Sequence, residues 1–174
     1  MKALASATLD YGTAAQIKFN HNAAGLTVRN TVSNLALSKL KNYKTSTTPK
    51  ADRVDGVSMS LNVEFGADNT LFVTYSLPSG KPEKDYTFTI DGNTVTPVSL
   101  GSGYYKLQLT NISPNKLGTS HIFNCTDGTK NCSVETSVLG YANLLASQTS
   151  AEESLKNLAK AMYLYSQAAI AYAG

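Results

Sequence analysis

Two segments near opposite ends of the chain have closely similar sequences. Residues 1–19 and 156–172 match when the first is shifted by 154 positions, from Tyr11 to Tyr165 for example. The shift places Lys2 on Lys156, Leu4 on Leu158, Ala5 on Ala159, Ala7 on Ala161, Tyr11 on Tyr165 and Ala14-Ala15 on Ala168-Ala169. A shared Tyr-x-x-Ala-Ala pattern at a distant offset is typical of repeated architectures. We therefore expect this chain to be one unit of a longer protein.

Both similar segments carry apolar residues at the spacing of a helix face. The apolar stripe of the last segment comprises Leu155, Leu158, Met162, Tyr165, Ala169 and Tyr172. Small Ala residues beside large Tyr residues let a neighbouring helix approach closely. Because neither stripe is stable alone in water, we expect the first stripe, with Leu4, Tyr11 and Ala15, to pack against the last.

Two more helix signals occupy the C-terminal part of the chain. Residues 137–146 have helical spacing, and 147–150 predict a turn. Ser150-Ala151-Glu152-Glu153 matches a capping box, in which a Ser and a Glu three residues later exchange hydrogen bonds with the backbone. We therefore expect Ser150 to cap the last helix.

The middle of the chain changes from helical to strand periodicity. Residues 57–65 alternate apolar and polar side chains, which predicts a strand with one buried face. Further strand-like runs lie at 71–75, 86–90, 94–96, 104–109, 121–125 and 132–138. Asp91-Gly92 and Asp127-Gly128 predict hairpins. Roughly six or seven strands in about eighty residues predict an antiparallel sandwich that resembles the immunoglobulin class.

These patterns together predict an α+β fold, an immunoglobulin-like β-sandwich flanked by N- and C-terminal helices that pack together. The predicted parts are an N-terminal helix at 1–24, an irregular connector at 25–56, a sandwich at 57–138 and a C-terminal helix pair at 139–174. The first and last parts form one helical layer. Within the connector, residues 26–43 fit either an irregular strand or short helical turns.

The two cysteines flank the second predicted hairpin turn. Because Cys125 and Cys132 lie on either side of Asp127-Gly128, we expect them on facing strands at a separation that a disulfide can bridge. A pairing that places the two cysteines directly opposite each other has a different register from a hairpin with a two-residue Asp-Gly turn. A disulfide and two buried thiols therefore both remain open. Zinc is disfavoured, since His121 is only one further candidate for a four-ligand site.

Charge and hydropathy argue against two classes of function. The formal net charge is +3 and the Lys residues are scattered, so no basic stripe is available for a phosphate backbone. No segment approaches the run of about 20 apolar residues that spans a bilayer. We therefore expect neither nucleic-acid binding nor membrane insertion. A signal-peptide pattern is also absent from this sequence, so any export signal would precede it.

Four segments carry a resemblance to a known kind of module. They are LDYGTAAQ at 9–16, YTFTIDGN at 86–93, YYKLQLTNIS at 104–113 and LKNLAKAMYLYSQAA at 155–169. Together they resemble a module of large exported proteins of gut and rumen Firmicutes, over nearly the whole chain. The resemblance implies an extracellular or cell-surface location, beside other domains of the same polypeptide and near polysaccharide. The two cysteines depart from this pattern.

The sequence contains no recognisable catalytic motif. His21 and His121 are the only histidines, and neither accompanies a Gly-x-Ser-x-Gly turn; His21 is expected at a helix end. Asp91 and Asp127 belong to predicted turns, where backbone geometry explains them. The carboxylates without such a local role are Glu64, Asp68, Asp85 and Glu135. We therefore predict a protein that is not an enzyme, with no catalytic residue, cofactor or metal.

Calcium binding is a weaker alternative. Asp68-Asn69 beside Gly66, and Asp91 with Asn93, place oxygen ligands on predicted loops. Neither group follows the spacing of a known calcium loop. Ordinary turn chemistry explains both.

Two classes of function remain, and carbohydrate binding is the leading one. Sugar rings stack on aromatic side chains, while their hydroxyls bond to Asn, Asp and Gln. Adjacent tyrosines on a strand must place one ring outside, so the candidate binding residues are Tyr104, Tyr105, Tyr75, Tyr86 and Asn111. The same rings would also serve to pad the rim of a sandwich, and the absence of Trp weakens stacking. The alternative function is a structural or adhesive spacer in a tandem surface array.

Overall fold

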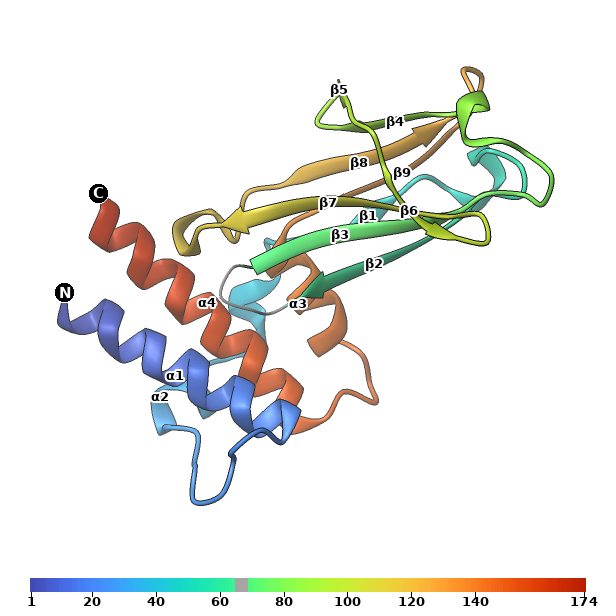
Figure 1. The fold of residues 1–174 in the computed structure, drawn as a ribbon. Coiled ribbons are helices and arrows are strands. Elements are labelled where there is room, and N and C mark those ends of the chain that lie inside the picture. Colours follow the sequence, from blue (N-terminus) through green and yellow to red (C-terminus); the bar gives the residue numbers. More distant parts are fainter. Residues whose placement is uncertain (65–68) are drawn as a thin grey trace. The chain divides into compact units, whose positions relative to one another are not determined.

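The computed structural model describes residues 1–64 and 69–174, which fold into two compact units. The helical unit contains residues 1–44, 113–118 and 138–174, and the two-sheet unit contains residues 45–112 and 119–137. Each unit therefore combines segments that are far apart in the sequence (Figure 1). The connector expected at 25–56 is divided between the two units after Lys44.

The helical unit is built around two long helices. Its elements are α1 (Lys2–Phe19), α2 (Asn30–Ser33), η1 (Leu37–Leu40), η4 (Pro114–Lys116), α3 (Val138–Ala146) and α4 (Glu153–Ala173). Helices α1 and α4 lie side by side and run in opposite directions (Figure 1). Of the two alternatives for residues 26–43, short helical turns are correct and an irregular strand is wrong.

The similar residues of α1 and α4 meet at the centre of the helix pair. The rings of Tyr11 and Tyr165 stack with centroids 5.4 Å apart and planes 9° from parallel. These are the two tyrosines that correspond under the 154-residue shift. Burial raises the pKa of Tyr11 to about 12, with a further contribution from Tyr165. The predicted packing of the N-terminal helix on the C-terminal helix is therefore confirmed.

Two buried polar residues tie the segment around α2 to the long helices. Asp10 on α1 is only 8 % exposed, and both of its carboxylate oxygens accept hydrogen bonds from Arg29. Lys160 on α4 is 6 % exposed, and its Nζ donates to the carbonyl oxygen of Ser33 at 2.9 Å. A buried charge requires such partners. The helical spacing of the two long helices predicts neither contact, because Arg29 and Ser33 lie at the two ends of the short helix α2.

The predicted capping box at the start of the last helix is wrong. Helix α4 begins at Glu153, and its N-cap position is Glu152, without a side-chain cap. The Glu152 carboxylate instead accepts hydrogen bonds from Lys18 Nζ at 2.8 Å and from Ser154 Oγ at 3.2 Å. The bond from Lys18 is the main reason that the pKa of Glu152 is lowered. Ser150 remains in the preceding turn, outside the helix.

Helix α1 ends with a left-handed residue. Asn20 has φ 51°, and the next amide, that of His21, donates to the carbonyl oxygen of Gln16 at 2.9 Å. This is the bonding pattern of a Schellman motif. The expectation that His21 lies at a helix end is confirmed.

The second unit contains two antiparallel sheets. Their strands are β1 (Ser46–Thr47), β2 (Ser58–Glu64), β3 (Asn69–Ser76), β4 (Thr87–Ile90), β5 (Asn93–Thr94), β6 (Val98–Gly101), β7 (Tyr104–Ile112), β8 (His121–Thr126) and β9 (Asn131–Thr136). One sheet has the order β1-β9-β8-β4-β5, and the other has the order β2-β3-β7-β6. The predicted α+β class, with two antiparallel sheets and terminal helices that contact each other, is confirmed. Phe65, expected at the end of the first strand, lies outside the described residues.

Aromatic rings connect the inner faces of the two sheets. Phe88 of β4 makes an edge contact with Tyr75 of β3, with centroids 5.9 Å apart, and lies 6.0 Å from the ring of Tyr105 on β7. On β8, Phe123 and Cys125 are both fully buried. Because successive side chains of a strand alternate between its faces, the residues between these positions point away from the core.

The two Asp-Gly pairs form turns of different lengths. Asp91 and Gly92 have φ of 52° and 79° and form a two-residue turn, with Ile90 paired to Asn93. The second hairpin has a four-residue loop, 127–130, because Asp127 Oδ1 accepts hydrogen bonds from the amides of residues 129 and 130. Both predicted hairpins are confirmed, and the longer loop decides the register of the second.

Candidate functional site

A row of polar side chains crosses the outer face of the five-stranded sheet. Thr89 of β4 is paired with Asn124 of β8, which is paired with Ser133 of β9. Thr48, just after β1, continues the row, because its Oγ1 lies 2.7 Å from Ser133 Oγ. Thr48 Oγ1 also accepts the backbone N–H of Ser133 at 3.0 Å. We refer to Thr89, Asn124, Ser133 and Thr48 as the polar row.

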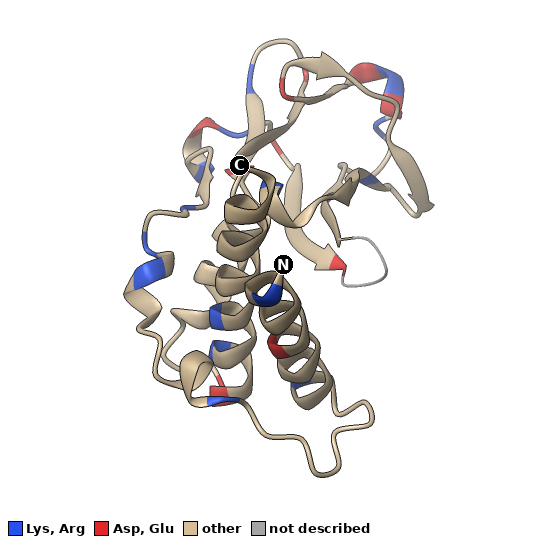
Figure 2. Ribbon diagram, turned by 90° about the vertical axis from the view of Figure 1, so that its left-hand side faces the viewer, with Lys and Arg blue, Asp and Glu red and all other residues tan. Residues whose placement is uncertain are grey.

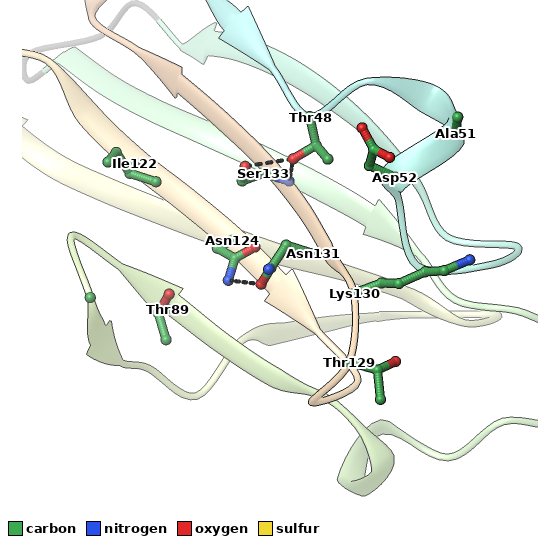
Figure 3. A pocket seen from close by; sticks show the side chains of 11 residues that line it. Thr48, Ala51, Asp52, Thr89, Ile122, Asn124, Thr129, Lys130, Asn131 and Ser133 are labelled. Carbon is green, nitrogen blue, oxygen red and sulfur yellow. Dashed lines mark hydrogen bonds between the residues drawn. The ribbon is translucent and has the colours of Figure 1, made fainter.

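The polar row forms the floor of a groove of about 730 Å³ (Figure 3). The remaining lining residues come from the turn after β4, from β8, from the β8–β9 hairpin and from the η2 turn (Lys50–Asp52). They are Gly92, Ile122, Thr129, Lys130, Asn131, Ala51 and Asp52. We call this cavity the sheet groove. Its volume lies within the range of about 300–1,000 Å³ that small-molecule sites occupy.

The floor of the sheet groove has unused hydrogen-bonding capacity. Asn124 Nδ2 donates to Asn131 Oδ1 at 3.2 Å (Figure 3). Asn124 Oδ1 is buried and has no hydrogen-bond partner among the described residues. A buried acceptor left unpaired destabilises a fold unless something supplies a donor. Asn124 Oδ1 is therefore the one buried side-chain acceptor of the polar row that has no partner among the described residues.

The sheet groove has one ion pair and one further carboxylate. Lys130 Nζ forms an ion pair with Asp55 Oδ1 at 2.9 Å. Asp52 is the one carboxylate among the described lining residues. Since Lys130 is already partnered by Asp55, an anionic ligand finds no unopposed positive charge among the described lining residues. The sheet groove therefore suits an uncharged polar ligand.

An Asp–His contact positions the turn at one end of the sheet groove. Asp91 Oδ1 accepts the backbone N–H of Ile122 at 2.8 Å, and Asp91 Oδ2 lies 2.7 Å from His121 Nδ1. Partial burial alone would raise the pKa of Asp91, but the hydrogen bonds from His121 and Ile122 lower it overall. These contacts join the β4–β5 turn to β8. His121 is thus a structural residue in this fold.

The loop beside Lys130 yields a pH prediction. Hydrogen bonds from the amides of Lys130 and Thr129 lower the pKa of Asp127 to about 2. Because the folded pKa is below the unfolded one of about 3.9, the carboxylate stabilises the loop above pH 4 and ceases to do so as pH falls through 2. We expect an NMR titration to show the Asp127 carboxyl and both amides shifting together near pH 2. An Asp127 midpoint near pH 4 would contradict the bonding.

Two of the tyrosines expected to bind sugar point into the core. Tyr75 is fully buried, so its ring has no face open to a ligand, which corrects the expectation for this residue. Tyr105 is its register partner on β7 and packs against Phe88. Both face inward because paired residues of antiparallel strands share a face of the sheet.

The other predicted site residues are exposed to different degrees and do not form one surface. Tyr104 is 47 % exposed on the outer face of the four-stranded sheet. Tyr86 immediately precedes β4, which belongs to the other sheet. Asn111, near the end of β7, has φ 58° and is exposed. The five expected residues therefore do not form a binding platform. Tyr104 is the one among them with an exposed aromatic ring on a strand.

The residues of the polar row were not predicted from the sequence as a site. Alternation along β8 and β9 does contain a signal, since Asn124 and Ser133 each lie between two inward-facing residues. The signal is incomplete, because Thr48 and Thr89 belong to separate segments. Only the pairing of four strands brings these side chains together.

Charged and metal-binding side chains do not gather in the described part of the chain. Figure 2 shows Lys and Arg spread over helices, strands and loops, interspersed with Asp and Glu. Residues 1–64 and 69–174 contain no group of three or more His, Cys, Asp or Glu that could hold a metal ion. Gly66 and Asp68 of the weaker calcium candidate lie outside the described residues. Within the same ranges, no helix has the length and apolar character to cross a membrane.

Comparisons with protein-family models, curated proteins and solved structures found no match to this chain. The described lining residues offer hydroxyls, amides, one carboxylate and one ammonium group, and no His or Cys. This set is suited to hydrogen bonding with a ligand.

Proposed function

We propose that this protein is a non-catalytic carbohydrate-binding module of a larger extracellular or cell-surface protein. Its ligand is an uncharged polysaccharide, held in the sheet groove. The observation that carries the proposal is the polar row, with the unpartnered Asn124 Oδ1 at its centre. The two-sheet unit serves as an immunoglobulin-like scaffold for this surface. Neighbouring domains of the same polypeptide are its expected partners.

The chemistry of the polar row matches that of a sugar chain. Each sugar hydroxyl both donates and accepts a hydrogen bond, and the side chains of Thr, Ser and Asn do the same. Because neighbouring strands are about 4.8 Å apart, a row over four strands extends roughly 14 Å. That length allows contacts with more than one sugar ring. Asp52 adds a negative charge beside the neutralised Lys130–Asp55 pair, which favours neutral glycans over acidic ones.

The expected affinity is weak. The described lining residues include no aromatic ring, so stacking on a sugar face makes no contribution in the sheet groove. Hydrogen bonds exchanged with water stabilise a complex only modestly. We therefore expect dissociation constants between micromolar and millimolar, which suit a module displayed in several copies.

Affinity gel electrophoresis tests the proposal. The panel contains neutral starch, xylan and mixed-linkage glucan, acidic polygalacturonate, and mucin. We expect at least one neutral glycan to retard the protein, and the double variant N124A/N131A to lose affinity by about tenfold or more. Tyr104→Ala, on the other sheet, is the matched control and is expected to bind like the parent protein.

Each outcome of this test assigns the function differently. Binding lost in Tyr104→Ala and kept in N124A/N131A would move the site to the outer face of the four-stranded sheet. Retardation by polygalacturonate alone would contradict the preference for an uncharged ligand. A panel without any retardation would contradict carbohydrate binding and favour the alternative.

The alternative is a structural or adhesive spacer in a tandem surface array. The stacking of Tyr11 on Tyr165 favours it, because corresponding residues of two similar helices pair with each other. A helix of one unit can then form equivalent contacts with a neighbouring unit. Under this alternative, a chain with two units in tandem unfolds at a higher temperature than a single unit, in one cooperative transition.

A further inference from the structure

Two cysteines face each other directly beneath the sheet groove. Cys125 of β8 and Cys132 of β9 are register partners, and both side chains are fully buried on the inner face of the sheet. Both thiols are free in this structure. Their chain neighbours Asn124, Asn131 and Ser133 line the sheet groove on the opposite face. Any change in the cysteine pair therefore acts on the two strands that form the groove floor.

The pairing brings the two cysteines within reach of a disulfide. Directly opposed residues of antiparallel strands have Cα atoms about 4.5–5.5 Å apart. Disulfides require Cα separations of about 4.4–6.8 Å and side chains on the same face, and register partners satisfy both conditions. The four-residue loop at 127–130 produces this alignment.

The surroundings of the pair suppress thiol chemistry once the sheets have closed. Phe88 of β4 is paired with Cys125 of β8. The fully buried Tyr75 of the other sheet contacts the Phe88 ring. Burial raises the pKa of the Cys125 thiol to about 12 and also raises that of Cys132. Because the thiolate is the reactive species, exchange in the folded protein is slow.

We propose that under oxidising conditions Cys125 and Cys132 form a disulfide before the two sheets close. The folded sheets then keep the pair in the redox state, bridged or reduced, that it had when the protein folded. The oxidant is a small disulfide such as oxidised glutathione. The two protein thiols lose two protons and two electrons, one S–S bond forms, and the glutathione S–S bond breaks to give two glutathione thiols, through a mixed disulfide. If the proposed function holds, the bridge also restrains Asn124 and Asn131 in the groove floor.

Refolding under controlled redox conditions tests the proposal. The intact protein is unfolded in urea and refolded either with oxidised and reduced glutathione or with excess dithiothreitol. It is then alkylated with iodoacetamide in denaturant and weighed by mass spectrometry. We expect no added label after oxidative refolding and two labels after reductive refolding. Two labels in both samples would overturn the disulfide.

A second measurement tests whether the folded sheets hold the redox state. We expect the native reduced protein to be alkylated at least a hundredfold more slowly than the unfolded chain. The native oxidised protein is expected to keep its bridge in dithiothreitol until denaturant is added. Equal rates in native and unfolded protein would overturn this part. Cys132→Ala is the control, because its single thiol cannot form the internal bridge: it takes one label after reductive refolding, and one label or one glutathione adduct after oxidative refolding.

Gel retardation of the two refolded forms separates this proposal from the proposed function. A blank glycan panel for both forms counts against carbohydrate binding and leaves the label count to decide the disulfide. Tighter binding by the oxidised form supports the link between bridge and groove. Equal binding by both forms overturns that link.

Discussion

Replacing Tyr165 with Ala is expected to lower the free energy of unfolding by about 2 to 3 kcal/mol. The ring of Tyr165 stacks on Tyr11 with centroids 5.4 Å apart, between the two longest helices of the helical unit. Its removal deletes a large apolar contact and leaves a cavity beside small Ala residues. Urea unfolding followed by circular dichroism at 222 nm measures the loss.

Tyr165→Phe is the matched control for this prediction. It keeps the stacked ring and removes only the hydroxyl, so we expect less than about 1 kcal/mol of change. Tyr165→Ala is also expected to bring the pKa of Tyr11 down from about 12, because burial by the helix pair raises it. An unfolding midpoint unchanged in Tyr165→Ala would refute the packing of the two helices.

Leu158→Ala and Leu4→Ala form a matched pair with a large expected difference. The two positions correspond under the 154-residue shift, yet Leu158 is 2 % exposed while Leu4 is partly exposed at the edge of a shallow pocket of about 280 Å³. A fully buried Leu replaced by Ala costs about 3 kcal/mol, since both transfer free energy and a cavity contribute. We expect about 1 kcal/mol at Leu4, where solvent already reaches the side chain.

The same urea titrations measure both leucine variants. Equal losses of unfolding free energy in Leu158→Ala and Leu4→Ala would contradict the different burial of the two leucines. Such a result would mean that the sequence similarity of the two helices extends to their burial.

Helix positions and strand positions were largely predictable from local patterns. The 3.6-residue period identified α1, α3 and α4, and alternation over 57–65 identified β2 (Ser58–Glu64). Both Asp-Gly hairpins were also expected. These signals act over a few residues, so a single segment contains the information. The start of α4 was mispredicted at Ser150 because a distant Lys18 binds Glu152.

The candidate site was much less predictable. Adjacent tyrosines were expected to place one ring outside, and Tyr104 does lie outside while Tyr105 packs against Phe88. Tyr75 was expected at the surface and is fully buried, since its side chain faces Phe88 of the other sheet. The sheet groove was not expected at all.

The sequence by itself determined which segments of this protein are helices and strands, because periodicity and turn chemistry are local properties. Beyond the two Asp-Gly hairpins, only the tertiary structure decided which strands pair and which faces are covered. Thr48 and Ser133 show the reason, since their hydroxyls lie 2.7 Å apart although 85 residues separate them in the chain. Arg29 and Asp10 form a similar contact between an irregular segment and a helix. Such contacts depend on strand order and helix packing, which the burial of apolar surface by the whole chain selects.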